Sequence, residues 1–191
     1  MNTLRLYTKR LVLCTADDNK IKAADLLAIH ERNHNFWQPW GPALPADFLT
    51  LQVQSDRLQT DLESLYKGTG LRFFIMTADN DETDTRPTIL GDINFSNIVR
   101  GIFQSCHLGC KIDENMQGRG YMVEALQAAI EYMFEVKQLH RIEANIMPRN
   151  KASVRVAEKL GFTCEGLSRK YLKINNQWED HLRYVVWNDA V

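Results

Sequence analysis

The sequence lacks the features that would place the protein in a membrane or on a nucleic acid. It has no apolar run near the roughly 20 residues that span a bilayer. Arg5, Lys9 and Arg10 interrupt the first stretch, so that stretch does not resemble a secretory signal. The formal net charge of -1 lacks the basic excess of a dedicated nucleic-acid binder. We therefore expect a soluble cytoplasmic protein without direct membrane or nucleic-acid binding.

Cysteine is also scarce, and its spacing is not that of a metal site. Without a secretory signal, the four cysteines are expected to be reduced thiols. Cys106 and Cys110 lie four positions apart around His107, which is not a standard zinc spacing. The alternation of Cys106, Leu108 and Cys110 fits one buried face of a strand better. We expect no bound metal here.

The length and composition match one ordinary globular domain, with 191 residues, 45% hydrophobic residues and 25% charged residues. A chain of this size buries about 70% of its extended surface, so its core needs no disulfide or metal. The sequence shows no internal repeat, low-complexity segment or interdomain linker. We expect residues 1–191 to form a single domain.

The hydrophobic periodicity predicts an α/β (α+β) fold with about four helices and a mixed, mostly antiparallel sheet of about seven strands. Helices are expected over 15–34, from Phe48 to Gly68, from Gly120 to about Phe134, and from an Asn150 N-cap to Gly161. A strand or hairpin arm is expected over 4–6 and 11–13, followed by strands over 71–78, 88–99, 105–113, 141–147, 171–174 and 178–187, with a polar turn over 79–87.

Positive charge is concentrated between Arg141 and Lys173. Eight Lys or Arg residues stand there against three Glu residues, which gives a local balance of +5. A basic region inside a neutral protein suits a polyanionic small ligand as well as a nucleic acid. It is equally compatible with a solvated helix face and a loop.

The segment His30-Glu31-Arg32-Asn33-His34 matches the H-E-x-x-H pattern of zinc hydrolases. Only three of its five positions are specified, so chance matches are common. Trp37 and Trp40 occupy the positions at which the extended motif has Gly and His. We therefore retain a zinc hydrolase only as a minor alternative.

The segment Gln117-Gly118-Arg119-Gly120-Tyr121-Met122 connects an expected strand to the most regular helix. Glycines allow backbone N–H groups to approach a phosphate closely, and a helix N-terminus favours negative charge. Arg119 adds a cation at the same point. The spacing is neither that of a Walker loop nor that of a dinucleotide fingerprint. The segment is either an anion-binding loop or a glycine-rich turn.

This segment resembles the acetyl-CoA pyrophosphate loop of the GNAT N-acetyltransferases, Gln/Arg-x-x-Gly-x-Gly/Ala. Two downstream segments, 147–153 and 158–162, resemble the second signature of that superfamily. Within the superfamily, segments 94–101, 139–142 and 177–181 are similar to the RimJ type, the ribosomal-protein-alanine N-acetyltransferases. The similarity begins at Thr8 and is densest from Leu90 to Asp180.

The resemblance implies acetyl-CoA as cosubstrate, no metal, and a sheet whose fourth and fifth strands splay apart around the pantetheine arm. The acceptor amine would attack the thioester directly, and a backbone N–H near Ile112 would stabilise the oxyanion. The implied cofactor contacts are Leu108, Cys110 and Ile112 on the splayed strand, Gln117, Gly118, Arg119, Gly120, Tyr121 and Met122 in the loop, and Asn150.

The chain departs from the family pattern at the acid and base. The glutamate base of some ribosomal-protein acetyltransferases aligns with Asn145, and their tyrosine acid aligns with Ala157, so that pair is absent. Ser153 matches a serine proposed to meet the departing thiolate, which makes it the candidate catalytic residue. It could equally cap a helix. Other candidate bases are Glu143, His107 and Asp180.

The loop around Trp37 and Trp40 lies where this fold has one wall of the acceptor cleft. The two rings are candidate substrate-binding residues for a peptide end, or core anchors of the loop. An α-amino group has a pKa of about 7.7–8.0 against about 10.4 for lysine. A site without the glutamate base therefore favours a peptide N-terminus.

The sequence thus predicts an acetyltransferase that acts on the N-terminal alanine of a small-subunit ribosomal protein, as a monomer or homodimer. One alternative is acetylation of another small primary amine, such as an amino sugar or polyamine. The other is a non-catalytic CoA-sensing or ribosome-binding module.

Overall fold

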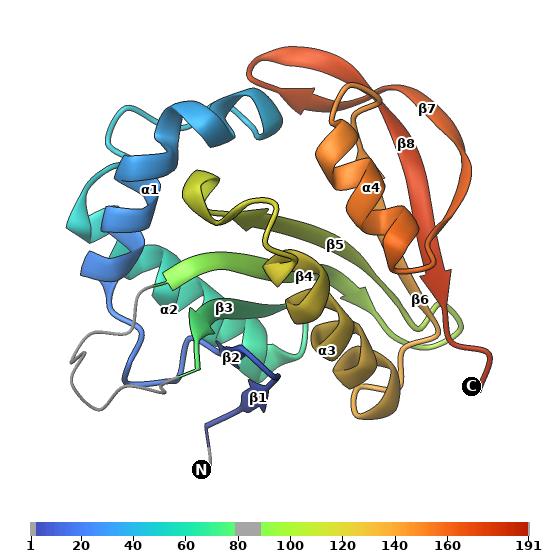
Figure 1. Cartoon of the computed structure of the whole chain (residues 1–191), viewed down its shortest axis with the longest axis horizontal. Coiled ribbons are helices and arrows are strands. Elements are labelled where there is room, and N and C mark those ends of the chain that lie inside the picture. The colour runs from blue at the N-terminus through green and yellow to red at the C-terminus, as the bar shows by residue number, and fades with distance from the viewer. Residues whose placement is uncertain (1–2, 79–88, 191) are drawn as a thin grey trace.

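The centre of the protein is an eight-stranded sheet (Figure 1). The computed structural model describes residues 3–78 and 89–190, so the expected turn over 79–87 lies outside the described residues. The strands are Arg5–Tyr7 (β1), Leu11–Cys14 (β2), Leu71–Thr77 (β3), Ile89–Val99 (β4), Ser105–Ile112 (β5), Arg141–Ile146 (β6), Thr163–Ile174 (β7) and Gln177–Trp187 (β8).

The strand order is β1-β2-β3-β4-β5-β6-β8-β7. Within the described part of the chain, β5 and β6 form the parallel pair, and the other neighbours are antiparallel. The predicted α/β class with a mixed, mostly antiparallel sheet is therefore confirmed. The count rises from about seven to eight because the N-terminal segment forms two short strands.

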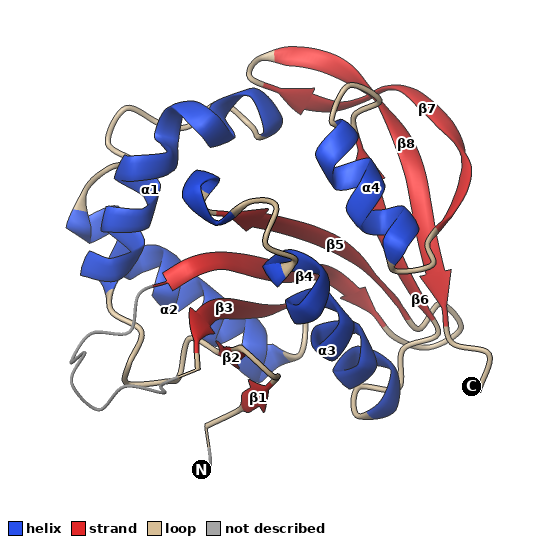
Figure 2. Ribbon diagram, viewed as in Figure 1, coloured by secondary structure: helices blue, strands red, loops and turns tan. Residues whose placement is uncertain are grey.

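Among the described residues, four α-helices cover the two faces of the sheet (Figure 2). They are Ala23–Trp37 (α1), Leu51–Lys67 (α2), Tyr121–Glu135 (α3) and Lys151–Lys159 (α4), with short 3₁₀ helices at Gln38–Trp40 (η1) and Glu114–Met116 (η2). None of the described helices combines the length and apolarity needed to cross a membrane.

Strand alternation sorts the apolar side chains between two cores. Phe73 and Ile93 pack with Leu126 of α3 on one face of the sheet. Phe74, on the opposite face, packs with Ile29 of α1. Each helical layer therefore has its own hydrophobic cluster.

Two predicted boundaries are wrong. The first helix begins at Ala23, not near residue 15, because the segment before it is bonded to β1 and a turn. Asp18 accepts a hydrogen bond from Arg5 Nε at 2.6 Å and one from the Lys20 N–H at 2.9 Å. The strand expected over 171–174 begins at Thr163, since it pairs with β8 along its length despite register shifts.

The sheet opens between β5 and β6. The two strands pair only from Ser105 opposite Arg141 to His107 opposite Glu143. Beyond His107, β5 keeps β4 as its neighbour on one side and loses β6 on the other. The predicted splay is therefore confirmed, between these two strands.

The hydrogen-bond pattern of β5 determines which backbone groups face this opening. Asp113 N–H donates to Leu90 O of β4 at 2.7 Å. Because antiparallel strands alternate the edge to which successive residues direct their N–H and C=O groups, Gly109 and Lys111 face β4. The intervening residues face the gap; they are Leu108, Cys110 and Ile112.

Gly91 allows β4 and β5 to approach closely beside the opening. A Cβ atom added at Gly91 would lie 2.2 Å from Lys111 O and 2.9 Å from Ile112 Cα. Both are backbone atoms of a paired strand, so the contact cannot be relieved by rotating a side chain. A larger residue at this position must displace one of the strands.

We predict that Gly91→Ala lowers the free energy of unfolding by about 1–3 kcal/mol because of this overpacking. Urea denaturation measures the change. Gly109→Ala is the matched control on β5, since its added Cβ meets nothing within 4 Å. It should change the free energy by no more than about 0.5 kcal/mol. Equal stability of the two variants would contradict the close approach.

Candidate active site

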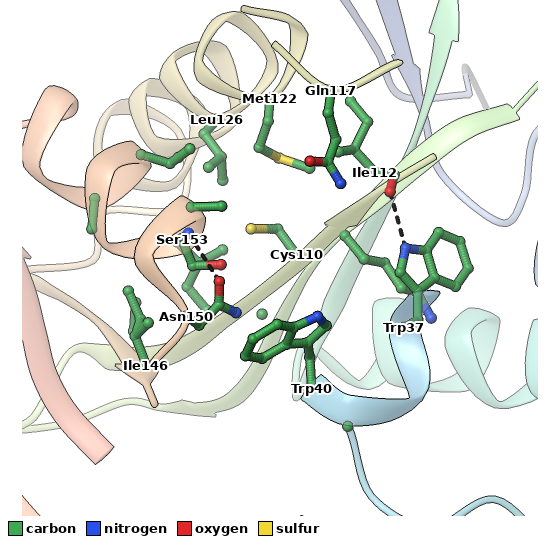
Figure 3. A pocket seen from close by; sticks show the side chains of 18 of the residues that line it. Trp37, Trp40, Cys110, Ile112, Gln117, Met122, Leu126, Ile146, Asn150 and Ser153 are labelled. Atoms are coloured by element: carbon green, nitrogen blue, oxygen red, sulfur yellow. Dashed lines mark hydrogen bonds between the residues drawn. The ribbon is translucent and has the colours of Figure 1, made fainter. Parts of the chain in front are cut away.

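A cavity of about 930 Å³ lies where β5 and β6 diverge (Figure 3). Ligand sites have volumes of about 300–1,000 Å³, so this cavity is large enough for an extended ligand. It brings together twelve of the thirteen predicted site residues: Trp37, Trp40, Leu108, Cys110, Ile112, Gln117, Gly118, Gly120, Tyr121, Met122, Asn150 and Ser153. Arg119 is exposed and is not part of the lining.

The glycine-rich loop directs the start of α3 toward this cavity. Gly118 and Gly120 have φ values of 71° and 78°, which are strained for residues with a Cβ. No side chain among the described residues caps α3. The N–H groups of its first turn are therefore suited to bind an anion.

Arg10 and Glu124 hold this loop in place. Arg10 Nη1 donates to Arg119 O at 2.9 Å, and Arg10 Nη2 lies 2.6 Å from Glu124 Oε2. Thr8 Oγ1 donates to Glu124 Oε1 at 2.7 Å. Burial alone would raise the pKa of Glu124, but hydrogen bonds from Thr8 and Arg10 outweigh it and lower the pKa. Sequence patterns did not single out Glu124, because its partners lie more than a hundred residues away.

The H-E-x-x-H segment is not arranged as a zinc site. The ring of His30 packs edge-on against Trp37 and Phe48, at 5.3 and 4.9 Å between centroids. Burial, together with the charges of Lys111 and Arg57, lowers the pKa of His30 to about 3. Arg57 Nη1 lies 2.8 Å from His30 Nε2, and a guanidinium can only donate. The lone pair that a metal would need is therefore used. The described residues contain no group of three metal-ligating side chains.

The intervening residues of that segment instead fix the end of β5. Arg32 Nε donates to Asp113 Oδ2, and Asn33 Nδ2 donates to the same oxygen at 3.2 Å. Asn33 Oδ1 accepts the N–H of Glu114 at 2.8 Å. Burial would raise the pKa of Asp113, but the bonds from Arg32 and Asn33 lower it. This contact positions the start of the glycine-rich loop.

Trp37 forms a hydrogen bond with the open edge of β5. Its Nε1 donates to Ile112 O at 2.9 Å, so the indole replaces the neighbouring strand that Ile112 lacks (Figure 3). Lys111 Nζ lies 4.7 Å from the centre of the same ring. Trp37 thus acts as an anchor of the wall as well as lining the cavity.

Trp40 is placed by contacts across the cavity. Arg149 Cζ lies 5.2 Å from its ring centre, and Arg149 Nη2 donates to Glu179 Oε1 at 2.9 Å. Asn175 N–H donates to Gly41 O at 3.1 Å. Trp40, the last residue of η1, is therefore held by contacts with the start of α4 and the β7–β8 hairpin.

Asn150 and Ser153 lie together at the start of α4. Asn150 Oδ1 accepts the N–H of Ser153 at 3.1 Å, so the predicted N-cap is confirmed (Figure 3). The cap uses the backbone of Ser153 and not its hydroxyl. Among the described residues, no hydrogen bond involves that hydroxyl, and the residue lines the cavity.

The basic segment is only partly directed at the cavity. Arg155 and Lys159 of α4 line it. Arg141 is instead paired with Glu165, at 2.6 Å, and with Glu143, at 3.3 Å. Part of the local +5 balance is therefore neutralised in ion pairs on the sheet.

None of the three candidate bases lines the cavity. Glu143 is buried, which would raise its pKa, but bonds from Arg183, Asn145 and Arg141 lower it and make the carboxylate a weak base. The other two make contacts elsewhere: His107 Nδ1 with Asn97, and Asp180 with the N–H of Lys170. The cavity is lined instead by Asn145 and His181.

The cavity combines the open edge of a parallel strand pair with a glycine-rich helix N-terminus. This arrangement suits an elongated anionic cosubstrate from which a group is transferred. Residues 10–163 match the acetyltransferase (GNAT) domain family. The chain therefore belongs to the GNAT acetyltransferases, whose members use acetyl-CoA, and it is an acetyltransferase.

Several similar proteins carry the names of ribosomal-protein acetyltransferases. The chain is 38% identical over 179 residues to the ribosomal protein uS5-alanine N-acetyltransferase of Escherichia coli, covering 94% of this chain and 88% of that protein. The ribosomal-protein-S5-alanine acetyltransferase structure from Vibrio fischeri is 32% identical, with a TM-score of 0.84 and 97% of both chains covered. Mycobacterium smegmatis RimJ in complex with CoA-disulfide shares the fold, with a TM-score of 0.85 at 23% identity over 99% of this chain and 88% of that one.

We predict that Trp37→Phe lowers the free energy of unfolding by about 1–2 kcal/mol, because Ile112 O loses its donor. Urea denaturation measures the loss. Trp40→Phe is the matched control, since no described residue accepts a hydrogen bond from its indole; we expect a change of no more than about 0.5 kcal/mol. A Trp37→Phe variant as stable as wild type would show that the bond does not hold the strand.

Proposed function

We propose that the protein transfers the acetyl group of acetyl-CoA to the N-terminal alanine amine of a small-subunit ribosomal protein in the cytoplasm. The observation that carries the proposal is the opening between β5 and β6. It exposes the backbone groups of Leu108, Cys110 and Ile112 in the same cavity as the glycine-rich loop. The 38% identity to the uS5-alanine N-acetyltransferase supports the substrate.

The residues around the opening fit acetyl-CoA, which supplies an acetyl group activated as a thioester. The edge of β5 offers N–H and C=O groups spaced as for a further strand, which suits the amides of a pantetheine arm. The segment 117–122 would hold the pyrophosphate through N–H groups at the α3 terminus. Asn150 would contact the cofactor beside them, and Arg155 and Lys159 add positive charge along α4.

The acetyl carbon would lie near Ile112 and Ser153, which both line the cavity. The backbone N–H of Ile112 faces the gap and would stabilise the oxyanion. The hydroxyl of Ser153 would protonate the departing thiolate. Trp40 and Trp37 would flank the incoming peptide end. The protein would act as a monomer or homodimer.

An N-terminal amine fits this site better than a lysine amine. An α-amino group has a pKa of about 7.7–8.0, so a substantial fraction is neutral at physiological pH. The cavity contains no carboxylate among the lining residues that are described. A weaker base therefore suffices for an α-amine. Another small primary amine is the second candidate acceptor, because the cavity is large enough for one.

We predict acetyl transfer to a peptide that begins with the N-terminal sequence of a small-subunit ribosomal protein starting with Ala. The protein is incubated with acetyl-CoA and the peptide, and thiol release and peptide mass are followed. A gain of one acetyl group at the α-amine is the expected result. A matched peptide with a blocked N-terminus and a free lysine should not react.

Transfer to the blocked peptide would contradict the N-terminal assignment. Transfer to an amino sugar or polyamine, with no transfer to the peptide, would favour the second candidate. Stabilisation by CoA without release of thiol for any amine would contradict the catalytic assignment and favour a sensing module.

A further inference from the structure

Asn145 lines the cavity and carries a side-chain oxygen without a hydrogen-bond partner. Its Oδ1 is buried and is one of two buried side-chain polar atoms in the described chain without a hydrogen-bond partner; the other is His34 Nδ1. Its Nδ2 donates to Glu143 Oε1 at 3.2 Å. A carboxylate can only accept, so this bond fixes which end of the amide is oxygen. A buried acceptor without a donor indicates a ligand that brings one.

His181 lines the same cavity and has one ring nitrogen that is not used in a described hydrogen bond. It is 2% exposed and lines the cavity. Its Nδ1 lies 3.0 Å from Glu179 O, and because a carbonyl only accepts, Nδ1 carries the proton. In the neutral ring Nε2 is then an acceptor. No described residue is bonded to Nε2.

The two side chains lie on one face of neighbouring strands. Asn145 on β6 is opposite Arg183 on β8, and His181 is two residues away along β8. Such diagonal neighbours are about 7–8 Å apart, which leaves room for one amine between them. Ile146 and Tyr184 point to the other face, into the core with α3 and α4. Asn145 and His181 therefore point to the face where Trp40 stands.

We propose that Asn145 and His181 form the amine site of this acetyltransferase. Asn145 Oδ1 accepts an N–H of the acceptor amine, and His181 Nε2 takes a proton from it. This assignment deepens the proposed function and rests on it. In this assignment His181 is the base, because the chain has Asn145 where some related enzymes have a glutamate. Glu143 is not available as a base, since it is paired with two arginines.

The step balances without any further reactant. The amine nitrogen forms a bond to the acetyl carbon, the carbon–sulfur bond breaks, and sulfur leaves with the bonding electron pair. The nitrogen loses one proton to His181 Nε2. The thiolate gains one proton from Ser153, which is restored through water from the imidazolium. The products are the acetylated amine and the CoA thiol.

Two variants of His181 test the base. In His181→Asn, the new side-chain amide can still donate to Glu179 O but has no atom at the place of Nε2, so this variant should fold normally. We expect its kcat to fall about 10²- to 10⁴-fold, with the affinity for acetyl-CoA unchanged. His181→Ala leaves space for free imidazole, which should restore part of the rate. His107→Ala is the matched control, because that ring bonds Asn97 outside the cavity lining. It should keep its rate and show no rescue.

Asn145→Ala tests the amine contact. Loss of one charge-assisted hydrogen bond should raise the KM for the acceptor about tenfold, while the KM for acetyl-CoA stays constant. An equal rise in both KM values, or none, would assign Asn145 to the support of Glu143 alone.

The assignment of His181 is overturned if His181→Asn keeps the wild-type kcat, or if imidazole does not restore His181→Ala. These assays use whichever primary amine the wild-type protein acetylates. Failure of the alanine peptide with wild type therefore counts against the proposed substrate. Failure of rescue with an accepted amine counts against the amine site.

Discussion

The hydrogen bond from Trp37 Nε1 to Ile112 O holds the end of the β5 edge that β6 leaves unpaired. Without a neighbouring strand, that carbonyl would face the cavity unpaired, and an unpaired buried carbonyl is costly. The indole comes from the last turn of α1, so the bond joins the helical layer on one face to the open edge of the sheet. The gap can then stay open without the sheet closing on itself, and its exposed edge becomes a binding surface.

Charged contacts hold both ends of the segment that follows this edge. Arg32 and Asn33 hold Asp113 directly after β5, and Arg10 holds the carbonyl of Arg119 in the loop that follows. The segment between them carries the N–H groups suited to a pyrophosphate. The loop is therefore fixed before any ligand arrives, and preorganised donors lose less entropy when an anion binds. The proposed acceptor side lies on the opposite face, so the two substrates would meet at the opening between β5 and β6.

Local patterns in the sequence predicted most of the fold and twelve of the residues that the structure brings together in the cavity. Alternation and helical periodicity predict β5, β6 and α3, and the N-cap residue Asn150 predicts the start of α4. These elements are predictable because their signals come from residues that are close in the chain. The start of α1 was misplaced because Asp18 bonds Arg5, a tertiary contact with no local signal. Asn145 and His181 were not predicted as site residues for the same reason. His181 was noticed only as part of a family segment, and its approach to Asn145 depends on the pairing of β6 with β8.

Residue-resolved amide exchange, followed by NMR with and without saturating acetyl-CoA, tests the central claim most directly. The claim is that the cosubstrate pairs with the edge of β5 that β6 leaves open, in the way that a further strand would pair with it. It predicts slower exchange at Leu108, Cys110 and Ile112, whose amides face the gap. Gly109 and Lys111, which face β4, should change little. Unchanged exchange at the three gap-facing amides, in a protein that binds acetyl-CoA, would contradict the account.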